Sequence, residues 1–391
     1  MTRILVMIPS GEVYDHDCVR WYQASDIQRS IDHYHNIGDA FVFDSSLKLL
    51  DFDHLGVIEI RECDPAKIDQ YNEEYDYCFL RGSNYINSSM KWERTLEVIE
   101  RLRIPVIAFG IGAQAPSEGP LILSDETKNV LRAMSDHCVS LGVRGSYTAQ
   151  VLWDIGVKNA RIVGCPTLFR NRRPDLRIDL PAMDAIKNAG YTLRREVSTT
   201  YSPDIERYLA FQKETMLDMS NRFDLTVMAQ GEIEEKKIVF GTEEQRNEAL
   251  AQLTTNNWLG DGDDPLRKLY ETKLFYSDVV ADYDTIAQKQ DFVIGFRLHG
   301  NLISLANGVP SLYFTYDSRT SEFVETFGIP AYDVYSSEAF HLEDFWDQAL
   351  FEKFNRTYFE RYRDMRQFLE ENNLPHRMPD PNLPVRMRDV A

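Results

Sequence analysis

Short apolar runs alternate with segments of helical spacing along most of the chain. Strands buried on both faces of a parallel sheet are expected as continuous apolar runs, and their connecting helices as segments with an apolar residue every three or four positions. In the first half, the runs that predict strands are 4–8, 57–60, 77–80, 105–109, 139–143 and 161–163. Helices are predicted at 40–50, which we interpret as amphipathic, and at 91–102, 124–137 and 146–155. This repetition predicts right-handed βαβ units and a parallel sheet.

A second series of the same kind follows a change of composition. Residues 169–189 are polar and contain two prolines, Pro174 and Pro181, which is typical of a linker. Beyond them, strands are predicted at 191–193, 225–229, 279–281 and at the start of the stretch 292–314, and helices at 204–223, 285–290 and 342–373. We therefore predict two α/β domains, residues 1–180 and 181–391, with the helical tail in the second domain and a ligand cleft between the two.

Composition and charge narrow the classes of protein. The formal net charge of −19 and the pI near 4.9 argue against a general nucleic-acid binder, whose surface would be basic. No run approaches the roughly 18 apolar residues of a membrane span, and the N-terminal apolar run is too short for a signal peptide. The five scattered cysteines form no Cys-x-x-Cys pair, so we expect reduced thiols and a cytoplasmic protein. In the tail helix, acids alternate with arginines, which favours a packed amphipathic helix over a membrane-surface one.

The stretch 292–314 reads as strand, turn, short helix, turn and strand. Arg297 and His299 stand where the first of these strands gives way to the helix, at the sheet edge on which open parallel sheets bind ligands. A cation and an imidazole two residues apart suit a small anion that gains or loses a proton. The same two residues would also suit a solvated loop or a hydrogen-bond network in the core, and these residues alone do not decide between the readings.

Three further turns stand at strand ends or helix starts. Asn36-Ile-Gly-Asp39 precedes a helix, so its amides suit an anion or a polar ligand, although Asp39 is also a plain N-cap candidate. Gly110-Ile-Gly-Ala-Gln114 permits close approach to the backbone, and Arg144 follows the strand 139–143. No Walker loop, HExxH or Gly-x-Ser-x-Gly elbow is present. The pattern favours a metal-free reaction on an anionic substrate.

Three more motifs follow these along the chain: Gly164-Cys-Pro-Thr167, Gly295-Phe-Arg-Leu-His-Gly300 and Ala306-Asn-Gly-Val-Pro310. In its motifs and in their order, the chain resembles the polysaccharide pyruvyl transferase family from about residue 36 to residue 328. The resemblance implies an α/β fold of two Rossmann-like domains in a GT-B-like arrangement, with the acceptor on the first and phosphoenolpyruvate on the second. It also implies transfer of pyruvate from phosphoenolpyruvate onto two hydroxyls of a sugar, in a bacterial surface or exopolysaccharide precursor, as a cyclic ketal.

The resemblance also implies roles for single residues. The cationic residues that handle phosphoenolpyruvate in the family match Arg144, Arg297 and His299 here. The family often has a Lys or Arg after the last strand, and Arg319 is the nearest match to it. Arginine holds carboxylate and phosphate bidentately, and histidine suits general acid catalysis near neutral pH. Asp39 is the carboxylate expected to orient or deprotonate the acceptor hydroxyl. The residues expected in acceptor or cleft loops are Asn36, Gly38, Gly110, Gly112 and Gln114. No metal or cofactor is expected.

The chain departs from the family at two places. Met228-Ala-Gln-Gly-Glu232 stands where relatives commonly carry a His or an acidic pair, and residues 234–265 have no assigned role. A nucleotide-sugar glycosyltransferase of GT-B type and a non-catalytic saccharide-binding protein therefore stay as alternatives. A lipid-linked acceptor, a homo-oligomer and peripheral attachment at the inner face of the membrane also stay open.

Overall fold

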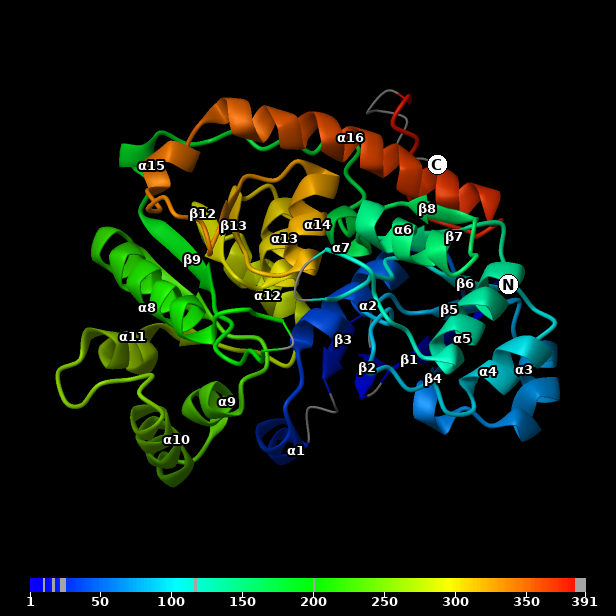
Figure 1. The fold of residues 1–391 in the computed structure, drawn as a ribbon, viewed down its shortest axis with the longest axis horizontal. Helices are drawn as coiled ribbons and strands as arrows, with labels where there is room; N and C mark the ends of the chain where they lie inside the picture. The colour runs from blue at the N-terminus through cyan, green and yellow to red at the C-terminus, as the bar shows by residue number, and fades with distance from the viewer. Residues whose placement is uncertain (10, 16–17, 22–25, 116–117, 200, 384–391) are drawn as a thin grey trace.

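The computed structural model describes residues 1–9, 11–15, 18–21, 26–115, 118–199 and 201–383. Its centre is two parallel sheets (Figure 1). The first has the order β4 (His54–Glu59), β1 (Arg3–Ile8), β5 (Tyr77–Leu80), β6 (Val106–Ala108). A parallel bridge between Ile111 and Val143 continues it into β7 (Leu141–Val143) and β8 (Ala160–Ile162). We call this sheet and its helices the first unit.

The second sheet has six strands and forms the second unit. Their order is β11 (Leu274–Phe275), β10 (Asp224–Met228), β9 (Asn188–Thr192), β12 (Phe292–Gly295), β13 (Ser311–Thr315), β14 (Ala331–Asp333). The strand order reverses between β9 and β12 here, and between β1 and β5 in the first sheet. In doubly wound sheets, ligands bind outside the carboxyl ends of the strands at such a reversal.

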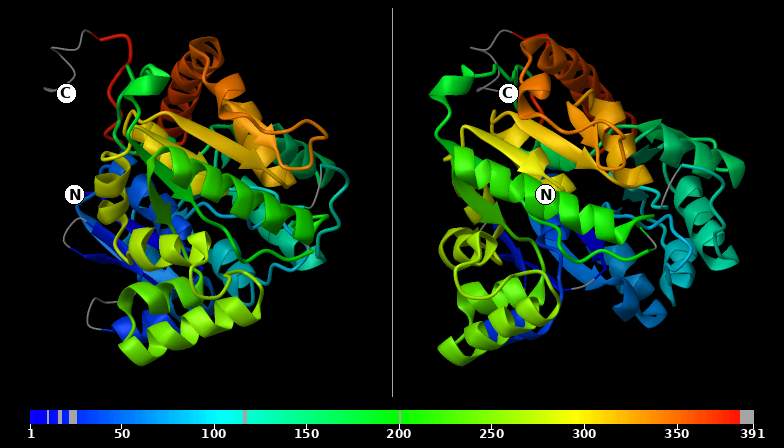
Figure 2. Two further views of the ribbon diagram at one scale, coloured as in Figure 1. Left: turned by 90° about the vertical axis from the view of Figure 1, so that its left-hand side faces the viewer. Right: turned by 60° about the vertical axis from the view of Figure 1, so that its left-hand side comes forward.

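The helices before the second sheet are α1 (Ile27–Asp32), α2 (Ile37–Leu49), α3 (Ile68–Glu74), α4 (Thr95–Arg101), α5 (Asp125–Asp136), α6 (Ser146–Asp154) and α7 (Pro166–Phe169). Those within and after it are α8 (Ile205–Arg222), α9 (Ile233–Phe240), α10 (Glu243–Thr255), α11 (Pro265–Lys273), α12 (Val280–Ala287), α13 (Leu298–Ala306), α14 (Ser318–Phe327), α15 (Leu342–Phe345) and α16 (Gln348–Glu371). A short antiparallel hairpin, β2 (Glu12–Asp15) and β3 (Cys18–Trp21), follows β1. Figure 2 shows α8 lying across one face of the second sheet, where Tyr208 and Met216 join its core. The expected fold class, two Rossmann-like α/β units in a GT-B-like arrangement, is confirmed.

Helix α2 lies between the two units rather than on a surface. Of its residues, all but Asp39 and Lys48 are buried. It packs on β3 and α7 on one side and on α12 and α13 of the second unit on the other. The prediction of an amphipathic helix at 40–50 was therefore wrong, because an apolar stripe on one side is expected only when solvent covers the other.

One more local prediction was wrong. Residues 279–281 were predicted as a strand, but α12 begins at Val280, and Val279 only forms an isolated bridge with Arg20. A short apolar run does not distinguish a strand from the start of a buried helix. The segment without an assigned role, 234–265, forms most of α9, all of α10 and the loop to α11.

Helix α16 runs along both units and returns the chain to the first (Figure 1). Beside its last turn, Arg161 pairs with Glu371 at 2.6 Å, and Asn372 bonds the backbone of Ser140. Arg377 then pairs with Asp51 at 3.0 Å. Among the described residues, no helix is both long enough and apolar enough to cross a membrane.

Arg170, in the segment predicted as a polar linker, is a buried clamp between the units. It follows α7, and its Nη2 pairs with Asp44 of α2 at 2.7 Å and with Asp284 of α12 at 2.6 Å. Its Nη1 donates to Ser45 at 3.2 Å. The guanidinium has no exposed surface, so its charge is balanced almost entirely by these two carboxylates.

Replacing Arg170 tests this clamp. Arg170→Met leaves two largely buried carboxylates without their main partner, so we expect a loss of about 3 kcal/mol in the free energy of unfolding, seen as a lower urea midpoint. The matched control is Arg177→Met, because Arg177 is half-exposed and pairs with Asp179 and Glu352 at the surface. That change is expected to cost less than about 1 kcal/mol. Equal midpoints for the two variants would contradict the clamp.

Candidate functional site

The carboxyl ends of β9 and β12 fix the start of α13. Gly295 ends β12 with φ +145, and a Cβ there would lie 2.6 Å from the carbonyl oxygen of Thr192. Only glycine therefore lets β12 approach β9 this closely. The amides of Phe296 and Arg297 then donate to the Thr192 carbonyl and hydroxyl at 2.9 and 3.1 Å. Arg297 is thus held as the N-cap residue of α13, at the reversal of the second sheet.

Arg297 already has a carboxylate partner within the protein. Its side chain is 3% exposed and forms an ion pair with Glu232, whose side chain is 0% exposed. Its Nε donates to the Leu193 carbonyl at 2.9 Å. Burial alone would raise the pKa of Glu232, but Arg297 overcomes this and leaves that pKa below its ordinary value. The departure from the family at 228–232 therefore contains the counter-ion of Arg297.

His299 lies in the first turn of α13 and contacts the first unit. A Cβ at Gly38 would lie 2.9 Å from its Nδ1, so the first turn of α2 reaches the imidazole. Its Nε2 is buried and has no hydrogen-bond partner among the described residues. Burial, and then the charges of Arg144, Arg319, Arg81 and Arg297, lower the pKa of His299 well below its ordinary value. The imidazole is therefore neutral near pH 7 in this structure.

The start of α2 is docked on the second unit. Asn36 caps the helix by accepting from the Gly38 amide at 3.2 Å, and the Ile37 amide donates to the Gln230 carbonyl at 2.8 Å. Asp39 pairs with Arg81 at 3.2 Å. Arg81, just after β5, also pairs with the buried Glu12 at 2.7 Å, and burial raises the pKa of Glu12 to about 7.

Arg144 is buried without a carboxylate partner. Among the described residues it forms no salt bridge, donates to Asn84 and lies 5.3 Å over the ring of Phe323. Its Nε has no partner, and burial lowers the pKa of the guanidinium. A buried, unpaired charge is costly, so this position favours an anionic ligand.

The two glycines of the Gly110–Gln114 turn have different roles. A Cβ at Gly112 would lie 2.7 Å from Cδ of Arg144, so this glycine makes room for the guanidinium. Gly110 has φ +72 and packs on Pro166, where a Cβ would lie 2.8 Å from Cδ. Gly110 therefore shapes the turn, and Gly112 admits Arg144.

Gln114 connects the cations of the two units. Its oxygen accepts from Asn84 at 3.2 Å, and its amide reaches Asp317 at 3.5 Å. Asp317 caps α14 and pairs with Arg319 at 3.3 Å. Contacts thus run from Arg144 through Asn84 and Gln114 to Asp317 and Arg319.

The structure therefore brings Arg144, Arg297 and Arg319 around His299, with Gly38 beside His299 and Gly112 beside Arg144. Gln114 reaches this group through Asn84 and Asp317. Asn36 accepts a hydrogen bond from the Gly38 amide, and Asp39 pairs with Arg81. Gly110 packs on Pro166, which is not a member of this group. Four residues at the same edge were missed: Arg81, Arg194, Glu232 and Tyr316. Arg81, Arg194 and Tyr316 lie within two residues of the carboxyl ends of β5, β9 and β13. Arg144 and Arg297 were selected because they follow strand ends, and the same criterion would have selected these three.

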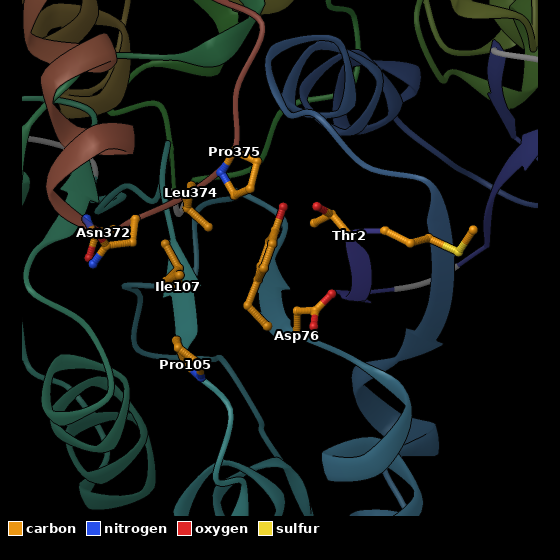
Figure 3. Close-up of a pocket in the computed structure, with 10 residues that line it drawn as sticks. Thr2, Asp76, Pro105, Ile107, Asn372, Leu374 and Pro375 are labelled. Atoms are coloured by element: carbon orange, nitrogen blue, oxygen red, sulfur yellow. The ribbon is translucent and has the colours of Figure 1, made fainter.

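A pocket of about 390 Å³ lies elsewhere, at the amino ends of β1, β5 and β6 (Figure 3). Thr2, Asp76 and Pro105 line it from these strand starts, and Leu374 and Pro375 from the segment after α16. It faces away from the edge that carries Arg297 and His299. In the described part of the chain, no group of three or more His, Cys, Asp or Glu side chains is placed to hold a metal ion.

Solved structures with a similar fold share little sequence with this chain. They include MnaA of S. aureus with UDP (12% identity, 96% of this chain and 98% of that chain, TM-score 0.42) and HepE of Anabaena with UDP and glucose (11%, 95% and 96%, 0.40). A third is the UDP-GlcNAc 2-epimerase of Methanocaldococcus jannaschii with UDP-GlcNAc and UDP (11%, 93% and 92%, 0.39). At these scores they carry no argument about function.

The family comparison is more informative. No curated protein matches the chain. The model of the family described as polysaccharide pyruvyl transferase matches residues 36–318, which is more than half of the chain and includes the turns around His299. The chain therefore belongs to the polysaccharide pyruvyl transferase family.

Proposed function

We propose that this protein transfers the pyruvyl group of phosphoenolpyruvate to two hydroxyls of a sugar in a surface-polysaccharide precursor, forming a cyclic ketal. The observation that carries the proposal is the buried guanidinium of Arg144, which forms no salt bridge with the residues that the structure describes and acts on an imidazole whose Nε2 has no hydrogen-bond partner among them. Phosphoenolpyruvate carries a phosphate and a carboxylate, and arginine binds both groups bidentately.

The three predicted anchors have unequal roles in this proposal. Arg297 and Arg319 already pair with Glu232 and Asp317, whereas among the described residues Arg144 forms no salt bridge, donates to the neutral Asn84 and lies over the ring of Phe323. A ligand anion therefore gains most at Arg144, because it replaces no salt bridge of the described residues there. Arg297 and Arg319 then add positive potential from fixed positions, and the proposed chemistry uses no further cofactor.

His299 gains its proton through the ligand. Burial, and then the guanidinium charges, keep the pKa of the free imidazole low, so an anion that neutralises these charges raises this pKa toward its ordinary value. Protonated His299 then gives its proton to the methylene carbon of phosphoenolpyruvate, and an acceptor hydroxyl adds to the cationic centre. Asp39 is the carboxylate that we assign to accept the hydroxyl proton. Phosphate leaves, and the second hydroxyl closes the ketal with loss of its own proton.

The reaction is tested with a panel of synthetic and lipid-linked glycosides. We expect phosphate release from phosphoenolpyruvate only when an acceptor is present, and a product heavier by one pyruvate ketal in mass spectrometry. Nucleotide release from a nucleotide sugar, without consumption of phosphoenolpyruvate, would instead identify a glycosyltransferase. Saccharide binding without any turnover would indicate a non-catalytic protein.

Arg144→Gln tests the main anchor. The variant loses one or two charge-assisted hydrogen bonds to the ligand, so calorimetry is expected to show phosphoenolpyruvate binding weaker by about 10- to 100-fold. Because Arg144 forms no salt bridge within the described part of the chain, the variant is expected to keep its thermal midpoint. Arg297→Gln, by contrast, leaves Glu232 buried and unpaired, so its midpoint is expected to fall. The binding control is Arg222→Gln, a surface arginine paired with Glu343. Unchanged binding by Arg144→Gln would remove Arg144 from the site.

Proton uptake tests His299. Because the pKa of His299 is below its ordinary value in the free protein and rises when an anion binds, binding near pH 7 is expected to take up protons. Calorimetry in two buffers of different ionisation enthalpy measures this number for the protein and for His299→Asn. The variant is expected to take up fewer protons, to keep most of its affinity and to lose turnover. Equal proton uptake by both proteins would contradict the assignment of His299 as the general acid.

A further inference from the structure

A second cluster of cations lies at the other side of Arg297. Arg194 follows β9, and its Nη1 donates to the Tyr316 hydroxyl at 2.6 Å. Nη2 of Arg319 donates to the same oxygen at 2.8 Å. Two guanidinium groups therefore share one neutral phenol oxygen. Nε of each is buried and has no partner among the described residues.

Charge at this edge is unbalanced at two separate points. Four arginines, Arg144, Arg194, Arg297 and Arg319, have salt bridges to only two carboxylates, Glu232 and Asp317, within the described residues. Arg144 and Arg194 form none. Arg144 is among the cations that act most strongly on His299, whereas Arg194 acts on Arg297 and lies over the rings of Tyr316 and Tyr201. The two unpaired charges are thus at different places along the edge.

The backbone of Arg194 is held in place for binding. Its amide donates to Gln212 of α8 at 2.8 Å, and its carbonyl accepts from Tyr208 at 2.8 Å and from Gln212 at 3.0 Å. The Tyr316 ring packs edge-on against Tyr208 with centroids 5.1 Å apart. Both partners of the cluster therefore stand on rigid elements of the second unit.

Exposure distinguishes the two ends of the edge. Arg144 and His299 are buried, whereas Arg194 is half-buried. Tyr34, whose phenol group acts electrostatically on Arg194 and Arg297, is 46% exposed. The small ligand of the proposed function is assigned to the buried end, so a longer ligand would extend past Arg194 toward solvent. An anionic group on that longer ligand would meet the second unpaired charge.

We propose that Arg194, Arg319 and Tyr316 form a second anion subsite, which binds a phosphate or diphosphate on the acceptor sugar. The inference rests on the proposed function, because it assigns phosphoenolpyruvate to the Arg144 end. It identifies the acceptor as a glycosyl phosphate or diphosphate rather than a neutral glycan. The subsite positions the acceptor and takes no part in bond making.

The full chain is first saturated with phosphoenolpyruvate and then titrated with inorganic pyrophosphate in a calorimeter. We expect pyrophosphate to bind beside phosphoenolpyruvate. Arg194→Gln is expected to weaken pyrophosphate about tenfold or more and phosphoenolpyruvate less than about twofold, and Arg144→Gln to do the reverse. Arg194→Lys is expected to bind pyrophosphate more tightly than Arg194→Gln but less tightly than the unchanged protein. Lysine keeps the positive charge but cannot form the bidentate hydrogen bonds of a guanidinium group.

Pyrophosphate that only displaces phosphoenolpyruvate, or does not bind to the saturated protein, would overturn the second subsite. Equal weakening of both ligands by Arg194→Gln would also overturn it, by placing Arg194 in the phosphoenolpyruvate site. Failure of the protein to bind phosphoenolpyruvate at all would instead contradict the proposed function. UDP replaces pyrophosphate in a last arm. Equal affinity for the two supports a diphosphate without a base, as in a lipid-linked sugar, and tighter UDP supports a nucleotide-linked one.

Discussion

Two arginines, Arg144 and Arg194, form no salt bridge among the described residues where the carboxyl ends of the two sheets meet, and the surrounding structure is arranged around these two charges. Burying an unpaired charge costs several kcal/mol unless other groups solvate it. Here the neutral acceptors are the Asn84 side chain, the Tyr316 hydroxyl and the Leu193 carbonyl. They reduce the cost without cancelling the charge, so the positive potential stays available to a ligand.

Such an arrangement lasts only if the two units cannot separate and let water in. Helix α2 supplies this constraint, because it is buried against both units and its start is bonded to the loop after β10. Arg170 adds an ion pair on each side of the same boundary. The contact between Gly38 and His299 is therefore set by packing on two units, and the imidazole keeps a fixed distance from the guanidinium groups.

Local sequence patterns predicted most elements that depend on local physics. Strands of the sheets are continuous apolar runs, and Ser124 and Asp204 cap the helices that were expected to begin there. The complete burial of α2 could not be predicted, because it depends on a second unit that its own periodicity does not describe. The partner of Arg297 was missed for the same reason, since Glu232 lies 65 residues away in the sequence. The position of Arg297 and His299 was predicted, because a strand end is a local feature. The low pKa of His299 follows from its burial and then from four arginines that are spread over the sequence, so no local pattern predicts it.

The net charge of −19 and the buried cations act over different distances. Surface acids are screened within roughly 8–10 Å at physiological ionic strength, whereas a guanidinium in a low-dielectric interior acts strongly on a group in contact with it. An anionic ligand therefore gains little from long-range attraction and gains most of its binding free energy only after it reaches Arg144. Because binding depends on short-range contacts, the site favours ligands that can lose their water and be held by several side chains at once. This dependence also explains why an acidic protein can depend on arginine for binding, since what matters is the unpaired charge at the site and not the total.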